Sequence, residues 1–150
     1  MIFVERDDPR DAQATALLDQ SYALMVQMFG DATLALSVDD LTAPEVAFFT
    51  ARRGTIKLGT AALVRHDGYG EVKSMFVEPA SRRQGIASAL LRGLEDEARE
   101  LGLPKLMLET GVGLDAGQTM YERHGFAYRG PFAAYDDHPM CRFMEKDLCP

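Results

Sequence analysis

A short glycine-containing segment, Arg82-Arg83-Gln84-Gly85-Ile86-Ala87, has the residue types of a site for phosphate groups. It follows the strand-like run Glu71–Val77 and opens a strongly helical stretch. The first N–H groups of a helix have no partner within that helix, so a small-residue turn there offers donors and a positive dipole end to an anion. Its small residues leave room for a pyrophosphate, and its arginines add charge-assisted hydrogen bonds. The segment therefore indicates a phosphate cradle, although many strand-to-helix turns contain a glycine simply to change direction.

Two other kinds of glycine loop fit the segment less well. A P-loop carries a Lys-Ser/Thr pair after its last glycine, and this chain has Ile86-Ala87-Ser88 instead. A dinucleotide-binding turn has three glycines in the pattern G-x-G-x-x-G, and only Gly85 stands where one of them would serve. The sequence thus argues against a nucleoside triphosphatase and against a dinucleotide-dependent enzyme.

The context of the turn resembles the GNAT N-acetyltransferase superfamily. Val77-Glu78-Pro79 precedes it, Arg82-x-x-Gly85-x-Ala87 forms it, and Met120-Tyr121-Glu122-x-x-Gly125-Phe126 follows about one βα unit later. The resemblance covers roughly Glu71 to Phe126 and does not specify a substrate. It implies an enzyme that uses acetyl-CoA as co-substrate and moves the acetyl group to a primary amine of a small molecule, peptide or protein. The transfer would be a direct attack in a ternary complex.

The resemblance also implies where the co-substrate lies. Its pantetheine arm would pair, like an added strand, with the backbone of Met75, Phe76 and Val77. Its pyrophosphate would contact the residues of the turn, which are Arg82, Arg83, Gln84, Gly85, Ile86, Ala87 and Ser88. Arg83 stands where the family often has glycine, so it either adds a phosphate contact or is a solvated charge.

The chain departs from the family pattern before its tyrosine helix. The family often has an asparagine there, whereas this chain reads Gly111-Val112-Gly113-Leu114-Asp115. Gly117 replaces a preferred alanine, at a cost to the helix on the order of 1 kcal/mol. Gly117 either gives the cofactor room or is neutral drift.

Tyr121 is the candidate general acid, because the resemblance places a tyrosine there near the sulfur of the cofactor. The expelled thiolate needs a proton or a hydrogen bond, and a phenol can donate either. The alternative is a tyrosine that is buried for packing between Met120 and Phe126.

Glu71 is the candidate general base, since some protein-lysine acetyltransferases of the superfamily have a glutamate at this position. An attacking ammonium must first lose a proton, and a carboxylate can take it directly or through water. The alternative is an exposed ion pair, because Glu71 and Lys73 point to one face of a regular strand. The bulge that the family has in this strand would change which face each residue meets.

The resemblance implies that the acceptor lies opposite the cofactor, between the first helix with its following loop and the late loop Tyr135–His138. Four acidic residues there either attract an ammonium group or simply lie in solvated turns. They are Asp39, Asp40, Asp136 and Asp137. Four apolar and aromatic residues either line an apolar pocket or only pack in the core. They are Tyr22, Met25, Phe48 and Phe49.

The periodicity of the chain predicts the elements that position these residues. Helices are expected over 14–29, 85–101 and 115–124, and strands over 2–4, 46–51, 56–64, 71–77, 105–109, around 128 and over 140–146. The pairs Arg92/Asp96 and Glu95/Arg99 would lie on the outside of the second helix. The implied fold class is α/β (α+β), a GNAT-type central mixed and mostly antiparallel sheet with a splayed parallel strand pair and helices on both faces.

Composition and charge indicate the number of domains, the class of partner and the location of the protein. The 150 residues, 47% hydrophobic, suit a single domain over 1–150. A formal charge of −7 argues against nucleic-acid and anionic-membrane partners and favours a cationic substrate. The start of the chain has no signal peptide or membrane span, so a cytoplasmic location is expected. Cys141 and Cys149 are expected to be reduced, and the scattered histidines predict no metal site.

A different class of function uses the same features. A GNAT-like domain that keeps the cradle without useful chemistry would be an acyl-CoA sensor or a partner-binding module. Replacement of Tyr121 by phenylalanine separates these hypotheses, because only an enzyme loses turnover while it still binds ligand. A homodimer through the late strands is an expectation from the family alone, since nothing in residues 128–148 requires it.

Overall fold

The order of helices and strands agrees with the order that the sequence predicts. The computed structural model describes residues 1–30, 35–111 and 114–148. Its elements are β1 (Phe3–Arg6), α1 (Ala12–Phe29), β2 (Val46–Arg53), β3 (Ile56–His66), β4 (Tyr69–Val77), α2 (Ile86–Glu100), β5 (Lys105–Gly111), α3 (Asp115–Arg123), β6 (Ala127–Arg129) and β7 (Cys141–Asp147). Two short 3₁₀ turns, Asp40–Thr42 and Pro79–Ser81, lie before β2 and α2.

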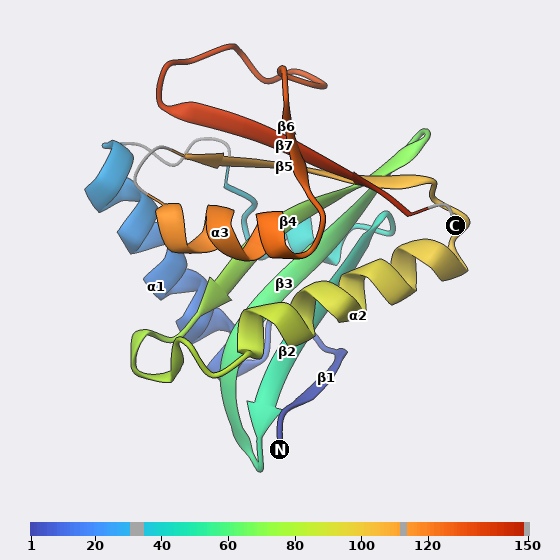
Figure 1. The fold of residues 1–150 in the computed structure, drawn as a ribbon. Coiled ribbons are helices and arrows are strands. Elements are labelled where there is room, and N and C mark those ends of the chain that lie inside the picture. The colour runs from blue at the N-terminus through green and yellow to red at the C-terminus, as the bar shows by residue number, and fades with distance from the viewer. Residues whose placement is uncertain (31–34, 112–113, 149–150) are drawn as a thin grey trace.

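The strands form one mixed sheet in the order β1-β2-β3-β4-β5-β7-β6 (Figure 1). Every neighbouring pair is antiparallel except β4 and β5, which are joined through α2 and run parallel. That pairing is short and runs only from Gly70 opposite Leu106 to Val72 opposite Leu108. Beyond it, β4 continues along β3 and β5 continues along β7. The predicted splayed parallel pair is therefore confirmed.

A β-bulge lies in β4 directly after the point where the two strands part. Thr60 and Ala62 of β3 pair with Phe76 and Lys73, so β4 has one residue more than β3 over this stretch. Ser74 takes up the extra length with a left-handed backbone, φ 54°, and its carbonyl accepts a hydrogen bond of 2.8 Å from the Thr60 hydroxyl. Such a bulge bends the strand and re-aims the side chains that follow it.

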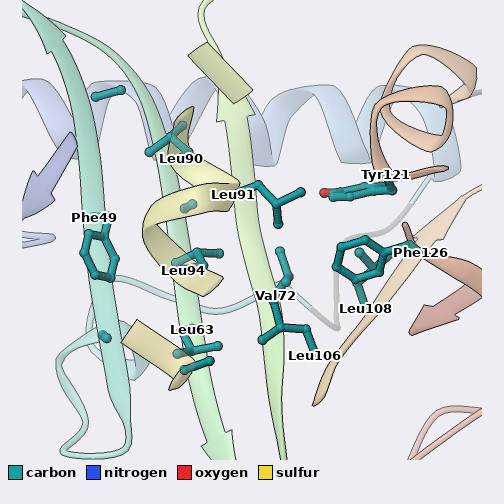
Figure 2. Close-up of a cluster of buried hydrophobic side chains, with 14 of the residues drawn as sticks. Phe49, Leu63, Val72, Leu90, Leu91, Leu94, Leu106, Leu108, Tyr121 and Phe126 are labelled. Atoms are coloured by element: carbon teal, nitrogen blue, oxygen red, sulfur yellow. The ribbon is translucent and has the colours of Figure 1, made fainter. Parts of the chain in front are cut away.

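Helices cover both faces of the sheet. On one face, α2 and α3 pack on a core that includes Leu63, Val72, Leu94, Leu108 and Phe126 (Figure 2). On the other face, α1 contributes Ala14 to a smaller cluster. Its other buried members are Leu41, Val46, Phe48 and Ala62.

Of the four residues considered for an apolar pocket, the two on the strand after the first helix are buried, and the two on the helix are exposed or half-buried. Phe48 and Phe49 are both buried, on opposite faces of β2. Tyr22 is 55% exposed on α1, and Met25 is half-buried. Packing therefore accounts for both phenylalanines.

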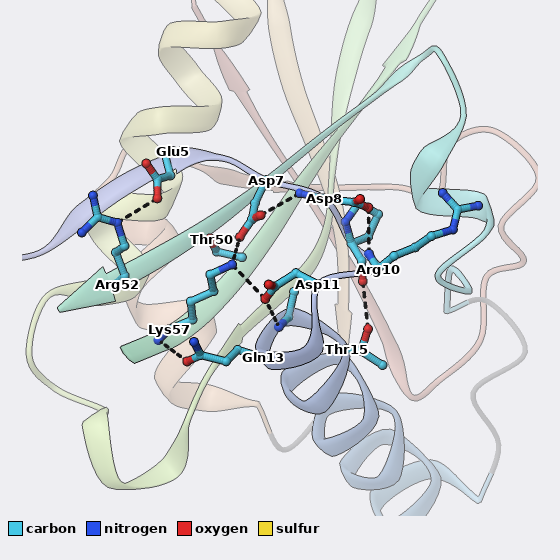
Figure 3. A network of polar contacts seen from close by, with 12 residues as sticks. Glu5, Asp7, Asp8, Arg10, Asp11, Gln13, Thr15, Thr50, Arg52 and Lys57 are labelled. Carbon is cyan, nitrogen blue, oxygen red and sulfur yellow. Dashed lines mark hydrogen bonds and ion pairs between the residues drawn. The ribbon is translucent and has the colours of Figure 1, made fainter. Parts of the chain in front are cut away.

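Charged residues tie the start of α1 to the sheet (Figure 3). Asp11 caps the helix by accepting a hydrogen bond of 3.0 Å from the N–H of Ala14. Lys57 of β3 bridges Asp11, at 2.8 Å, and Asp7, at 2.6 Å. Asp7 also accepts a 2.7 Å hydrogen bond from Thr50 of β2. These contacts fix the helix N-terminus against β2 and β3.

One of the surface pairs predicted for α2 is wrong. Glu95 is buried and pairs with Lys146 of β7, while Arg99 lies 3.8 Å from Asp96. Glu95 follows Leu94 of the apolar face, and Lys146 of β7 reaches it there. The helical period alone does not show which flank of a helix another segment covers.

Candidate active site

The turn before α2 has the geometry of an anion cradle. Gly85 adopts a left-handed conformation, φ 79°, as the N-cap of α2, and Arg83 is also left-handed with φ 65°. The first bond of the helix runs from the N–H of Ala89 to the carbonyl of Gly85 at 3.0 Å. The N–H groups of residues 86–88 therefore have no partner within the helix. A left-handed arginine is sparsely populated, and such strain is typical of functional turns.

The side chains of the turn differ in what they offer to a ligand. Arg82 is held against the end of β4, where its Nε donates to the carbonyl of Val77 at 3.1 Å and its guanidinium lies over the Phe76 ring at 5.6 Å. Ile86 is only 2% exposed, so its backbone alone can meet a ligand. The Ser88 hydroxyl lies 3.0 Å from Nε2 of His124, at the end of α3. Burial lowers the pKa of His124, more than nearby Glu95 raises it, so the ring is mostly neutral at pH 7.

Arg53 also reaches the turn, and the sequence reasoning missed it. It lies at the end of β2, and its Nη2 donates a hydrogen bond of 2.8 Å to Oε1 of Gln84. The sequence places these two residues 31 positions apart, and no local pattern connects them.

The edge of β4 that faces β5 is open along the segment that was expected to bind the pantetheine arm. Met75, Phe76 and Val77 follow the bulge, and within the described residues their only strand partner is β3. Phe76 and Val77 have buried side chains, so this segment can offer a ligand its backbone groups. An open strand edge is suited to an extended ligand that pairs as an added strand. Together with the donors of the turn, it fits a ligand with a long amide-containing arm and a pyrophosphate.

Tyr121 reaches from α3 into the core on the α2 face, where Figure 2 shows its hydroxyl directed toward Leu91. The residue is 7% exposed, and its ring meets the Phe126 ring edge-on at 5.5 Å. Among the described residues, its hydroxyl has no hydrogen-bond partner. Burial strongly raises the pKa of this phenol, so the group stays protonated at any physiological pH. The ring of Tyr121 thus packs in the core, while its hydroxyl is available as a hydrogen-bond donor.

Glu71 lies on the opposite face and is 5% exposed, so the alternative of an exposed ion pair is wrong. Its Oε2 accepts a hydrogen bond from the Tyr135 hydroxyl, and its Oε1 lies 3.0 Å from Nε2 of His66. Lys73 lies 3.9 Å from Oε2 and donates a hydrogen bond of 2.8 Å to the Tyr135 hydroxyl. The carboxylate therefore lies within a buried polar network.

Aromatic rings and a second carboxylate surround this network. The Tyr69 ring stacks on His66 at 4.6 Å, and Phe132 contacts both Tyr69 and Tyr135. Burial and the nearby charge of Glu71 raise the pKa of Glu109, and together they outweigh the nearby charge of Lys73, which lowers it. Burial and the hydrogen bond to Glu71 raise the pKa of Tyr135. The late loop, expected at the acceptor side, thus contributes Tyr135 to the surroundings of Glu71.

The two candidate catalytic residues approach the splayed strands from opposite faces. Val72 and Leu108, the last paired residues of β4 and β5, pack in the same cluster as Tyr121. Glu71 pairs with Met107, whose side chain lies in the separate cluster of Phe132 and Phe143. A group inserted where the strands part would therefore have a carboxylate on one side and a phenol on the other.

The other predicted positions have only local contacts, a surface ion pair or no described contact. A Cβ atom at Gly117 would meet nothing within 4 Å, and part of the stretch 111–115 lies outside the described residues, as does Cys149. The Asp40 carboxylate accepts a hydrogen bond of 2.9 Å from the N–H of Ser37, and the N–H of Asp40 donates one of 3.0 Å to the Ser37 hydroxyl. Asp39 pairs with Arg10 at 3.3 Å. In the described ranges no cluster of His, Cys, Asp or Glu could hold a metal ion. None of the helices described is long and apolar enough to cross a membrane.

The splayed strands and the anion-binding turn fit a transferase of the acyl-CoA type, and comparison with known proteins shows the family. The sequence profile of the Acetyltransferase (GNAT) family matches residues 13–126, so the chain belongs to that family and is an acetyltransferase. It is 37% identical to the IAA acetyltransferase of Azospirillum brasilense over 98% of both chains. It is 33% identical to an N-acetyltransferase of Bacillus subtilis over 97% of this chain and 99% of that protein.

Solved structures agree with this assignment. A Klebsiella pneumoniae protein assigned to the acyl-CoA N-acyltransferases is 30% identical over 99% of both chains, with a TM-score of 0.82. The PaiA N-acetyltransferase of Thermoplasma acidophilum, solved with coenzyme A, covers 98% of this chain and 99% of its own. It has a TM-score of 0.77 at 13% identity, which shows a shared fold.

Proposed function

We propose that this protein transfers the acetyl group of acetyl-CoA to a primary amine by direct attack in a ternary complex. The observation that carries the proposal is the placement of Glu71 and Tyr121 on opposite faces of the sheet where β4 and β5 part. A base and an acid on two sides of one reaction centre suit a transfer in which one proton leaves the amine and another reaches the thiol.

The binding residues hold the co-substrate in a defined orientation. The backbone of residues 75–77 pairs with the pantetheine arm, and the N–H groups of residues 86–88, with Arg82 and Arg83, bind the pyrophosphate. Bound acetyl-CoA supplies a thioester as acyl donor. The complex of PaiA with coenzyme A supports this assignment at the level of the fold.

Glu71 acts as the base. It takes a proton from the ammonium group of the acceptor, which frees the nitrogen lone pair for attack. His66 lies 3.0 Å from Oε1 and is a third exposed, so it connects the buried carboxylate with solvent. Tyr135 orients the carboxylate from the other oxygen. Tyr121 donates its hydroxyl proton, or a hydrogen bond, to the departing sulfur.

The surroundings of Glu71 favour a cationic acceptor. Glu71 and Glu109 are two carboxylates beside one ammonium group, that of Lys73, and the tyrosine and phenylalanine rings nearby provide apolar walls. An amine that arrives as an ammonium ion is attracted to such a site and loses its proton there.

Calorimetric titration with acetyl-CoA tests the first half of the proposal. We expect saturable binding of acetyl-CoA, no comparable binding of ATP, and weaker binding of acetyl-CoA by the double variant Arg82→Ala/Arg83→Ala. Equal binding of both ligands, or of neither, would reject the co-substrate assignment. Release of coenzyme A in the presence of polyamines, amino acids, lysine peptides and IAA, a compound named in one relative, then tests the acceptor.

A further inference from the structure

Arg53 has a surplus of hydrogen-bond donors at the phosphate cradle. Its guanidinium has five N–H groups, and one of them is bound to the neutral amide oxygen of Gln84 at 2.8 Å. A neutral partner orients the guanidinium without cancelling its charge. No carboxylate in the described part of the chain forms an ion pair with Arg53, Arg82 or Arg83, although the protein has a net charge of −7.

The turn that carries Arg53 is held in place. Gln13 of α1 clamps it from both sides, because its Nε2 donates to the carbonyl of Thr55 at 3.0 Å and its Oε1 accepts from the N–H of Lys57 at 2.9 Å. Arg52 donates a further 2.9 Å bond to the carbonyl of Gly54 within the turn. Figure 3 shows Gln13 and Lys57 in this arrangement. Arg53 is therefore presented from a rigid turn, which lowers the entropy cost of a contact with a ligand.

The position of Arg53 separates it from the pyrophosphate donors. Arg82 is anchored toward β4 through Val77 and Phe76, and the free N–H groups belong to the first turn of α2. Arg53 instead comes from the β2–β3 hairpin and touches Gln84 just before the N-cap. Figure 1 shows the end of this hairpin and the start of α2 in the same lower part of the molecule. An anion bound by Arg53 thus lies beside the turn rather than in it.

Coenzyme A has an anionic group of this kind, because it carries a phosphate on the ribose 3′ carbon besides its pyrophosphate. We propose that Arg53 recognises the 3′-phosphate and makes the protein select coenzyme A over 3′-dephospho-coenzyme A. The proposal rests on the proposed use of acetyl-CoA. A guanidinium that meets a phosphate forms paired, charge-assisted hydrogen bonds, and a local positive charge offsets repulsion between a tetra-anionic ligand and an acidic protein.

Titration of the purified protein with coenzyme A and with 3′-dephospho-coenzyme A tests the proposal without any acceptor. We expect the wild type to bind coenzyme A about tenfold more tightly than the dephospho form, because the loss of one charge-assisted hydrogen bond weakens binding by about this factor. Arg53→Gln should bind both ligands with the affinity that the wild type has for the dephospho form. Arg65→Gln is the matched control, since Arg65 is exposed and lies at the opposite end of β3. Arg53→Lys should restore part of the preference.

The outcomes separate this inference from the proposed function. Equal affinity of the wild type for both ligands, or an Arg53→Gln variant that keeps the preference, overturns the role of Arg53 and leaves acetyl-CoA as co-substrate. Weakening of both ligands by the same factor also overturns it, because Arg53 would then only support Gln84 in the cradle. Absence of binding of either ligand to the wild type rejects the proposed function itself, and this inference with it.

Discussion

Glu71 and Tyr121 are both buried, yet the polarity of their neighbours differs. Glu71 is contacted by the hydroxyl of Tyr135, a ring nitrogen of His66 and the ammonium of Lys73, all of which can stabilise a carboxylate. Tyr121 lies among leucine, valine and phenylalanine side chains, which keep its phenol neutral. The difference lies in the environments and not in the degree of burial.

Replacement of Tyr121 by phenylalanine tests its role as acid. The ring and its contact with Phe126 remain, so stability and acetyl-CoA binding should stay unchanged. We expect kcat to fall about 100-fold, the usual contribution of general acid catalysis. Steady-state kinetics with an acceptor from the screen, together with calorimetry, measure both quantities.

Tyr22→Phe on the exposed face of α1 is the matched control and should retain full activity. A Tyr121→Phe enzyme with normal turnover would show that the residue serves packing alone. An equal loss of binding and turnover would point to a role in holding the co-substrate.

The variant Glu71→Gln removes the proposed base and keeps the size of the side chain. Its amide oxygen still accepts a hydrogen bond from Tyr135, so the fold should persist. We expect kcat at neutral pH to fall about 100-fold and to recover partly at high pH, where the acceptor amine loses its proton to solvent. A pH profile of kcat for both enzymes measures this.

Glu45→Gln, an exposed position before β2, controls for the loss of one negative charge. If Glu71→Gln lowers the melting temperature but leaves kcat and its pH profile unaltered, the carboxylate has only a structural role.

At the scale of elements, β4 contributes to both parts of the proposed site. Its first half pairs with β5, the bulge at Ser74 follows, and its second half has an open edge toward β5. The same strand therefore carries Glu71 before the bulge and the expected pantetheine contacts after it. The turn that ends β4 leads directly into the cradle and α2.

The anchoring of α1 predicts how stability depends on pH. Burial raises the pKa of Asp7, but hydrogen bonds from Lys57 and Thr50 outweigh this and lower it below 3.8. A carboxyl with a lowered pKa stabilises the fold above its unfolded value, and this contribution is lost as pH falls through the folded value. Asp7→Asn should therefore cost about 1 kcal/mol at pH 7 and progressively less below pH 3.8.

Urea unfolding of both proteins between pH 3 and pH 7 measures this difference. Asp19→Asn, an exposed change on α1, should leave the free energy of unfolding unaltered at every pH. A constant difference between Asp7→Asn and the wild type across this range would contradict the pKa argument.

At the scale of the whole molecule, one sheet carries three clusters of buried side chains within the described residues. The largest lies under α2 and α3, another lies under α1, and a third contains Met107, Phe132 and Phe143. The strands β2, β3 and β4 contribute side chains to both faces. Shared strands couple the two faces, so we expect residues 1–150 to unfold as a single domain. A homodimer through the late strands stays a prediction from the family.

Leu94→Ala tests this cooperativity. The side chain is fully buried on the α2 face, so its loss should cost about 3 kcal/mol. Far-ultraviolet circular dichroism and tyrosine fluorescence should show one transition, shifted equally in both signals. Leu101→Ala, a partly exposed residue at the end of α2, should shift it little. Two separate transitions would show that the faces unfold independently.

Local pattern in the sequence determined the elements and the cradle, because helical and strand periods, glycine turns and capping residues act over a few positions. The α2 helix, the turn at Gly85 and the parallel strand pair were all predicted in this way. Tertiary structure alone decided which distant residues meet. Tyr135 lies 64 positions from Glu71, Arg53 lies 31 from Gln84, and Lys146 lies 51 from Glu95. The order of the strands and the packing of helices and loops against them bring these pairs together, and contacts that depend on the packing of whole elements leave no periodic signal in the chain.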